Sequence, residues 1–214
     1  MDATTTAASD EGPGPATSGV IIGAIWIAAV GASLAAVTYR AFDLDRFFVP
    51  KEMALHTGAL IAVVALAARR GPRATSRSDV ALAAWLVLSF VSALFATNGW
   101  HAGRALSLSA SAAALFWGAR ALGESDGARR AVIAIGAAVT LAAASSLAQA
   151  YGISFDVFAT NRAPGGTLGN RNFIAHVAAM GLPLLLWLSA TARSSARTLL
   201  GAFASLILSA ALVL

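Results

Sequence analysis

Seven apolar segments, each close to the length of a membrane-crossing helix, occupy most of this chain. A helix that crosses the hydrocarbon core of a bilayer needs about 20 residues, because each residue adds about 1.5 Å. Inside the hydrocarbon, backbone N–H and C=O groups must bond within the segment, which favours helices. The sequence therefore predicts an all-α, polytopic transmembrane helical bundle of about seven spans. The segments are residues 20–39, 53–68, 80–96, 104–122, 131–150, 173–191 and 199–214.

The composition also indicates an integral membrane protein. Hydrophobic residues make up 58% of the 214 residues and charged residues 12%, whereas soluble domains carry roughly 25% charged residues. The chain has no cysteine, and its three histidines form no ligand-spaced pair, so we expect neither a metal nor another cofactor. The net charge of +5 comes mainly from arginine. In a membrane protein an excess of basic residues reflects the orientation of the loops across the membrane and does not indicate nucleic-acid binding.

The two ends of the chain differ from the spans between them. Residues 1–19 are small, polar and acidic, and they lack the basic start of a signal peptide. We expect a disordered cytoplasmic tail there, followed by one transmembrane domain over residues 20–214. The last apolar segment reaches Leu214 without a polar flank, after about 16 residues or roughly 24 Å. We therefore expect the intact protein to continue, so that the domain is the N-terminal part of a longer one.

The distribution of basic residues between loops predicts the orientation. Lys and Arg number four, three and two in the loops 69–79, 120–130 and 192–198, and three, none and two in the alternating loops 40–52, 97–103 and 151–172. The second set spreads its charges over more residues. By the positive-inside rule, the N-terminus lies in the cytoplasm and the 151–172 loop lies outside.

The segment 162–176 is the most polar stretch beside the spans and reads RAPGGTLGNRNFIAH. Its glycines, including Gly166 and Gly169, permit positive φ and expose N–H groups. Asn172 stands where the N-cap of the next helix is expected. A glycine-rich turn that opens a helix favours an anion through its free N–H groups and the helix dipole. The turn is not a P-loop, because no Gly-Lys-Ser/Thr follows.

Two arginines and a histidine accompany this turn. Arg162 and Arg171 carry planar donors that suit phosphate. Asn172 and His176 are four residues apart and share one helix face. The same residues are equally compatible with a tight loop, a capped helix and arginines that extend to the lipid headgroups. From the residues alone, both interpretations stay open.

Other polar groups fall at the predicted outer ends of the spans. Lys51 is favoured as an interfacial anchor, whereas His56 lies deeper and is a functional candidate by its position. Arg104 opens the fourth span, and Gln149 near the end of the fifth is expected to bond to another helix. Together with the 162–176 segment, these groups predict a cationic outward cavity for a phosphorylated, lipid-linked substrate.

A family resemblance points the same way. GTLGNRNFIAH at 166–176, followed by GLP at 181–183, resembles the pattern GT-x-GN-x-N-x-x-A before a proline-containing helix in the O-antigen ligase and polymerase superfamily. The resemblance covers about residues 48–190. Weaker matches are FVPK at 48–51, NGW at 98–100 before Arg104, and QAYGI at 149–153.

The resemblance implies a membrane glycosyltransferase of the GT-C type in the bacterial inner membrane. Such an enzyme transfers glycan from an undecaprenyl-pyrophosphate donor, on the periplasmic side, to a lipid or glycan acceptor in lipopolysaccharide biosynthesis. Members carry most of their catalytic Arg and His residues on a large periplasmic loop in the C-terminal half, so we expect residues 1–214 to be inactive alone. No metal is implied, because arginines stabilise the pyrophosphate. The resemblance implies that Arg162 and Arg171 lie near the donor pyrophosphate. The catalytic residues stay unknown, with Arg171 and His176 as candidates, and the candidate substrate-binding residues are Arg162, Gly166, Gly169, Asn170, Arg171, Asn172, Arg104 and Lys51.

The competing class is a non-enzymatic polytopic protein, either a transporter or flippase-like half or a helical scaffold subunit. A transporter more often shows inverted repeats and broken helices that meet at the middle of the membrane. In this chain the polar groups cluster towards one face, which favours interfacial chemistry. Further spans after Leu214, with a long outer loop bearing Arg and His, would support the enzyme.

Overall fold

The computed structural model describes residues 14–36, 45–69, 75–123, 126–158 and 162–214, and every regular element in these ranges is a helix. Six of the helices are long and apolar enough to cross a membrane, and α4 packs among them. The predicted all-α membrane bundle of about seven spans is confirmed. The elements are α1 (Pro15–Leu34), α2 (Asp45–Ala67), α3 (Arg77–Leu94), α4 (Gly99–Ala121), α5 (Asp126–Ala150), the short 3-10 helix η1 (Gly166–Leu168), α6 (Arg171–Ala190) and α7 (Ser195–Val213).

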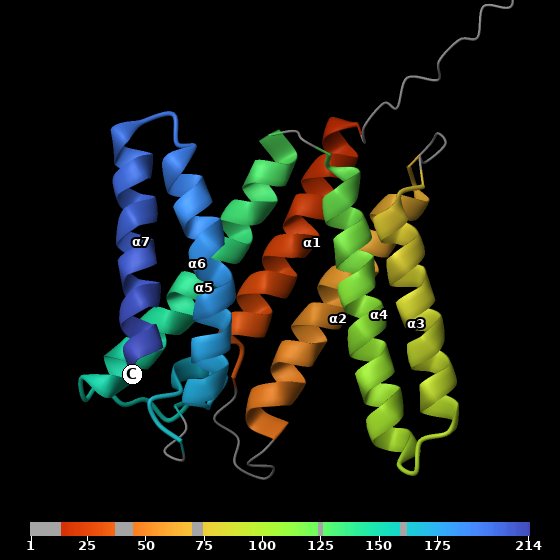
Figure 1. Cartoon of the computed structure of the whole chain (residues 1–214), viewed down its shortest axis with the longest axis horizontal. Helices are drawn as coiled ribbons and strands as arrows, with labels where there is room; N and C mark the ends of the chain where they lie inside the picture. The colour runs from red at the N-terminus through yellow and green to blue at the C-terminus, as the bar shows by residue number, and fades with distance from the viewer. Residues whose placement is uncertain (1–13, 37–44, 70–74, 124–125, 159–161) are drawn as a thin grey trace, which may run out of the picture.

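The helices alternate in direction, so the bundle has two distinct ends (Figure 1). One end, called the η1 end below, carries η1, the last turn of α1 and the first turns of α2, α4 and α6. The opposite end carries the start of α1 and the first turns of α3, α5 and α7. The predicted alternation of loops is therefore present, and the assignment of the η1 end to the outside stays a prediction.

All seven long helices begin before the corresponding apolar segments of the sequence. α1 begins at Pro15, so the predicted tail over residues 1–19 is too long, and proline at the first helical position fits a helix start. α2 begins at Asp45 and includes Lys51, which gives the short segment 53–68 the length that a span needs. Hydropathy misses these first turns because they contain polar residues.

Small residues bring α1 and α2 into close contact at the centre of the bundle. A Cβ on Gly58 would lie 2.6 Å from the carbonyl oxygen of Ala24 and 2.8 Å from the Cβ of Ala28, so only glycine fits. Membrane helices associate through such close approaches because lipid offers no hydrophobic driving force. One hydrophobic core joins α1, α2, α4 and α5 through Ile21, Ile25, Ala65, Leu66, Leu122, Ala131 and Ala134.

A second core joins α5, α6 and α7, while α3 lies at the edge. α5 contacts both groups and therefore connects the two halves of the bundle. α3 packs mainly along α4 and buries none of its residues. The second core consists of Ala142, Ala143, Ile174, Ala178, Leu185, Leu208 and Ala211.

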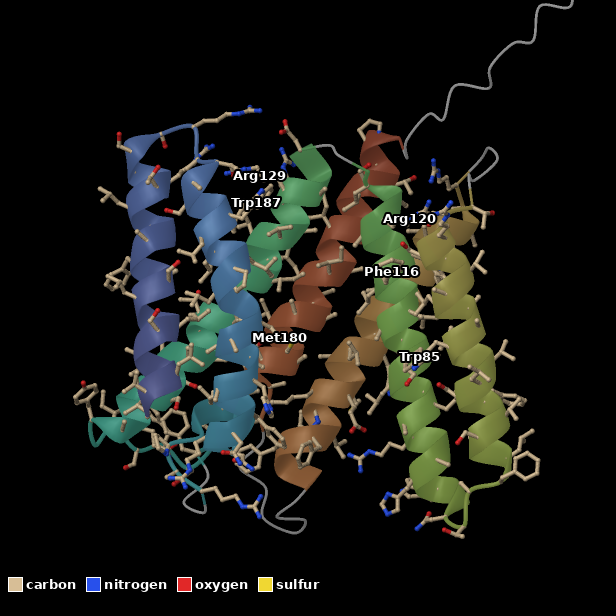
Figure 2. The ribbon with its side chains drawn as sticks, in the orientation of Figure 1. Trp85, Phe116, Arg120, Arg129, Met180 and Trp187 are labelled. Carbon is tan, nitrogen blue, oxygen red and sulfur yellow. The ribbon has the colours of Figure 1, made fainter. Side chains whose placement is uncertain are left out.

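Arginine side chains hold the helices together at the opposite end (Figure 2). Arg129 of α5 donates to the hydroxyl of Thr191 at 2.9 Å, and its guanidinium lies 5.5 Å from the ring centroid of Trp187. Thr191 caps the C-terminus of α6, where a positive charge is favourable to the helix dipole. Arg120 of α4 lies at the same end.

Candidate functional site

The turn before α6 requires glycine at the positions that the sequence singled out. Gly166 and Gly169 have φ of 49° and 73°, a conformation that L side chains rarely adopt. A Cβ on Gly166 would also lie 2.2 Å from Oγ of Ser145 and 2.6 Å from the backbone nitrogen of Ser146. The turn therefore lies directly against the backbone of α5.

The N–H groups of this turn are used within the protein. Oε1 of Gln149 accepts hydrogen bonds from the backbone N–H of Gly165 at 2.9 Å and of Gly166 at 2.8 Å. The N–H of Thr167 donates to Oγ of Ser145 at 3.0 Å. The expectation of free glycine N–H groups for an anion is wrong at Gly165 and Gly166, and also at Gly169, whose N–H donates to the carbonyl oxygen of Gly165 at 3.0 Å. The side chain of Gln149 thus bonds from α5 to the turn and to Gly166 of η1.

Contacts with distant helices fasten the turn from other sides. Oγ1 of Thr167 donates to the carbonyl oxygen of Ser33 in the last turn of α1 at 2.8 Å. Oγ of Ser146 donates to the carbonyl oxygen of Pro164 at 2.8 Å. The Cα of Gly169 packs against the ring of Phe47, which a Cβ would approach to 3.2 Å. The turn is thus packed among α1, α2, α5 and α6.

Asn170, and not Asn172, is the N-cap of α6. Its side chain accepts a hydrogen bond from the backbone N–H of Asn172 at 3.0 Å, and its backbone is extended as a cap requires. Asn170 is 8% exposed, whereas Asn172 lies exposed in the first turn of the helix. The prediction placed the cap two residues late, because two asparagines flank Arg171 and either could cap a helix.

Arg162, Arg171 and His176 point away from the core and are exposed. The backbone N–H of Arg171 donates to the carbonyl oxygen of Arg162 at 3.2 Å, so the two arginines start from adjoining points of the backbone. Within the described part of the chain, no residue forms a side-chain hydrogen bond or ion pair with any of the three. Their donors are therefore available to a ligand.

Lys51 and Arg104 are engaged inside the bundle. Nζ of Lys51 donates to the carbonyl oxygen of Ala35, the residue that ends α1. Nε of Arg104 lies 2.9 Å from each carboxylate oxygen of Glu52, and its Nη2 lies 2.7 Å from Oε1. The positive charges of these two candidates have partners from the protein.

His56 also has a structural partner. Its Nδ1 lies 2.7 Å from Oγ of Ser111, which joins α2 to α4. This hydrogen bond gives Ser111 a polar role inside the bundle. The sequence does not indicate this hydrogen bond, because 55 residues separate His56 from Ser111.

The predicted site residues therefore form two groups at the η1 end. An edge-to-face contact between Phe48 and Phe173, with ring centroids 6.2 Å apart, links the start of α2 to the start of α6. Lys51 and Arg104, on the α2 and α4 side, are internally paired. Arg162 and Arg171, at the start of α6, are available. Among the described residues, no three His, Asp or Glu side chains are placed to hold a metal ion.

No family model, curated protein or solved structure matches this chain. The resemblance to O-antigen ligases and polymerases thus depends on the motif residues themselves. What the arrangement offers chemically is a rigid turn that presents two guanidinium groups and an imidazole at one end of a membrane bundle.

Proposed function

We propose that the η1 end binds the pyrophosphate of a lipid-linked glycan, and that the protein works as a membrane glycosyltransferase of the O-antigen ligase or polymerase type. The observation that carries the proposal is the pair Arg162 and Arg171, whose guanidinium groups are exposed and whose backbones are joined by a 3.2 Å hydrogen bond. Two neighbouring planar donors match the several oxygens of a pyrophosphate.

The chemistry assigned to these residues is stabilisation of a leaving group and acceptance of a proton. Glycan transfer breaks the bond between the sugar and the pyrophosphate and forms a bond to an acceptor hydroxyl. Arg171 is the candidate that stabilises the negative charge on the departing pyrophosphate. His176, one turn further along α6, is the candidate base that takes the hydroxyl proton.

The position of the residues favours this function over a transporter. Transporters commonly place their sites at the middle of the membrane, where discontinuous helices meet. The available arginines here lie at the end of the bundle, and the described spans are continuous helices. A pyrophosphate at this depth leaves its polyprenyl chain in the hydrocarbon beside exposed apolar residues of α6 such as Phe173 and Met180.

Binding of undecaprenyl pyrophosphate to the purified protein in lipid nanodiscs tests the proposed site. We expect Arg162→Gln and Arg171→Gln each to weaken binding about tenfold, because each loses hydrogen bonds to a charged group. Arg193→Gln is the matched control, since Arg193 is exposed at the opposite end. Equal weakening by all three variants would show general charge attraction and contradict the site.

Glycan transfer by membranes that contain the protein tests the reaction. Arg162→Lys and Arg171→Lys keep the charge but lose the planar pair of donors. We expect both to transfer glycan from the carrier more slowly than the unchanged protein. Transfer at an unchanged rate in both variants would contradict recognition by paired donors and would favour arginines that only extend to the headgroups.

A further inference from the structure

The connection between α3 and α4 carries two of the most exposed aromatic side chains of the described residues. Phe95, the residue that ends α3, is 83% exposed, and Trp100, in the first turn of α4, is 78% exposed. Residues 95–100 are called the α3–α4 tip below. No Asp, Glu, Lys or Arg occurs from residue 95 to residue 103. Two large rings on one uncharged tip mark a surface that contacts something other than water.

Hydrogen bonds within the α3–α4 tip fix its shape. The backbone N–H of Phe95 donates to the carbonyl oxygen of Ser92 at 3.2 Å. Asn98 is the N-cap of α4, and its Oδ1 accepts a hydrogen bond from the backbone N–H of His101 at 3.1 Å. The two rings therefore extend from a short, hydrogen-bonded turn at the end of two helices.

Phe95 continues a row of apolar side chains along α3. Leu88, Val91 and Phe95 are spaced by three and four residues, so they share one face of the helix, and all three are exposed. α3 is long and apolar enough to cross a membrane and buries none of its residues. This face therefore contacts acyl chains, and Phe95 lies at the end of the same lipid-covered surface.

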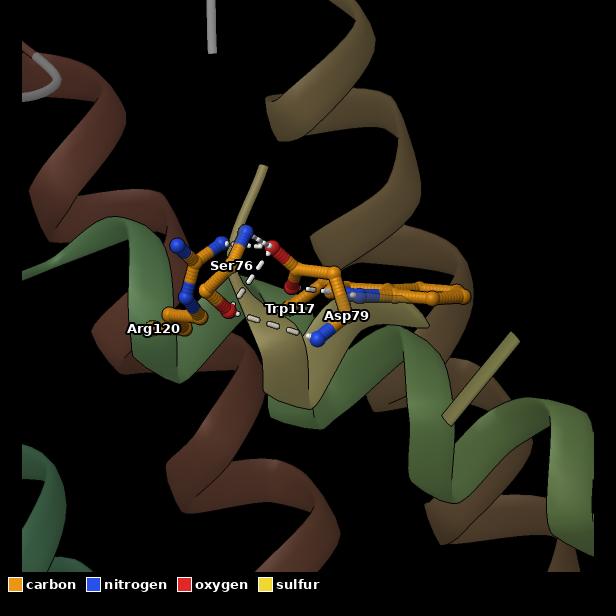
Figure 3. A network of polar contacts seen from close by, with 4 residues as sticks. All are labelled: Ser76, Asp79, Trp117 and Arg120. Carbon is orange, nitrogen blue, oxygen red and sulfur yellow. Dashed lines mark hydrogen bonds and ion pairs between the residues drawn. The ribbon is translucent and has the colours of Figure 1, made fainter. Parts of the chain in front are cut away.

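α4 carries a second tryptophan near its other end, where the protein uses the ring itself (Figure 3). Nε1 of Trp117 donates to Asp79 at 3.2 Å, and Asp79 also accepts from the backbone N–H of Ser76 at 2.8 Å and pairs with Arg120. Among the described residues, none accepts a hydrogen bond from Nε1 of Trp100. An apolar ring with an available N–H suits the layer where hydrocarbon meets the headgroups.

A second group of exposed aromatic residues lies at the other edge of the η1 end. Tyr151, Ile153 and Phe155 follow directly after α5, and all three are exposed. In Figure 1 the α3–α4 tip lies at the lower right and the connection after α5 at the lower left. One soluble partner would have to cover the whole η1 end to contact both groups, whereas a membrane surface extends past both edges.

We infer that the α3–α4 tip inserts into the interfacial layer of the membrane, with the rings of Phe95 and Trp100 between the headgroups and the acyl chains. The tip carries no acidic or basic side chain that would oppose this insertion. At the opposite end Asp79 fixes α3 to α4, and at the η1 end the two rings hold the tip at a constant depth. The tip shares no residue with the pyrophosphate site proposed above, so either can fail without the other.

Fluorescence quenching in lipid nanodiscs measures the depth of the tip. Thr97 is exposed between the two rings, and Thr97→Cys can be labelled selectively with an environment-sensitive fluorophore because the chain has no cysteine. We expect quenching by a phosphatidylcholine with a nitroxide near the headgroup end of its acyl chain, and weak quenching by iodide in water. Ser194→Cys, exposed in the α6–α7 connection, is the matched position and should show the reverse.

Substitution of the two rings tests whether they hold the tip. With the fluorophore at residue 97, Phe95→Ser together with Trp100→Ser should lose quenching by the lipid nitroxide and gain quenching by iodide. Phe95→Trp together with Trp100→Tyr keeps two aromatic rings and should behave like the unchanged tip, which separates loss of anchoring from loss of fold. Phe203→Ser removes an exposed aromatic residue of α7 and is the control.

Three outcomes would overturn the inference. Equal iodide quenching at residues 97 and 194 would place the tip in water, as expected if its rings bind a soluble partner. An unchanged depth in the double serine variant would show that the rings do not hold the tip. The same change of depth in Phe203→Ser would assign the effect to the general loss of an aromatic side chain.

Discussion

The side-chain oxygen of Gln149 accepts a hydrogen bond from the backbone N–H of Gly166, 2.8 Å away, and so fastens the turn before α6 to the end of α5. The same oxygen accepts a second hydrogen bond from Gly165. Gly165 and Gly166 are both buried, so their donors need this partner. One side chain thereby sets the position from which Arg162 and Arg171 extend.

Replacement of Gln149 by leucine should loosen this turn. Two buried N–H groups would lose their acceptor, at a cost of about 2–4 kcal/mol in the free energy of unfolding. We expect a lower melting temperature in detergent and faster hydrogen exchange at Gly165 and Gly166. Gln149→Glu keeps an acceptor oxygen and should keep slow exchange. Unchanged exchange in the leucine variant would contradict the assigned hydrogen bonds.

Replacement of Gly166 by alanine should be more damaging than the same change at another glycine with positive φ. Gly123 has φ of 61° and nothing within 4 Å of an added Cβ, so Gly123→Ala should cost about 1 kcal/mol for its conformation alone. Gly166→Ala adds a clash with Ser145 and Ser146, and we expect about 3 kcal/mol in total. Equal losses in thermal stability would show that the contact with α5 is not tight.

The predicted orientation is testable because the chain contains no cysteine. Ser154 and Ser194 are both exposed, and they lie in the α5–α6 and α6–α7 connections, at opposite ends of the bundle. In cells with a permeabilised outer layer, a membrane-impermeant maleimide should label Ser154→Cys. Ser194→Cys should react only after the membrane is disrupted. The reverse pattern would place the η1 end in the cytoplasm and refute the proposed periplasmic site.

The ion pair between Glu52 and Arg104 should contribute to stability. The two side chains are 20% and 30% exposed, so water only partly screens the interaction. A double-mutant cycle with Glu52→Gln and Arg104→Gln should give a coupling energy of about 1–2 kcal/mol in thermal unfolding. Additive effects of the two substitutions would mean that the pair contributes nothing. Arg104 would then be a better candidate for a substrate contact.

Local features of the sequence were sufficient to predict the helices and the special turn. Apolar segments close to the length of a membrane span form helices in the structure, because backbone N–H and C=O groups in hydrocarbon must hydrogen-bond to one another. Gly166 and Gly169 were correctly singled out, since a positive φ is a requirement of a single residue. The boundaries were less accurate, as at Pro15 and Asp45, because the first turn of a helix tolerates polar residues that hydropathy counts against it.

Which polar groups are available to a ligand was decided only by tertiary structure. Arg104 and Arg171 are the same residue type near the start of a helix, yet Arg104 is paired and Arg171 is exposed without a described partner. The difference arises because packing of α2 against α4 brings Glu52 to Arg104 across 52 residues of sequence. A hydrogen bond forms only where the donor and the acceptor lie within a few ångströms of each other, and the packing of the helices sets that distance. Composition and spacing determined the helices and their alternation, and only the contacts between helices decided where those donors point.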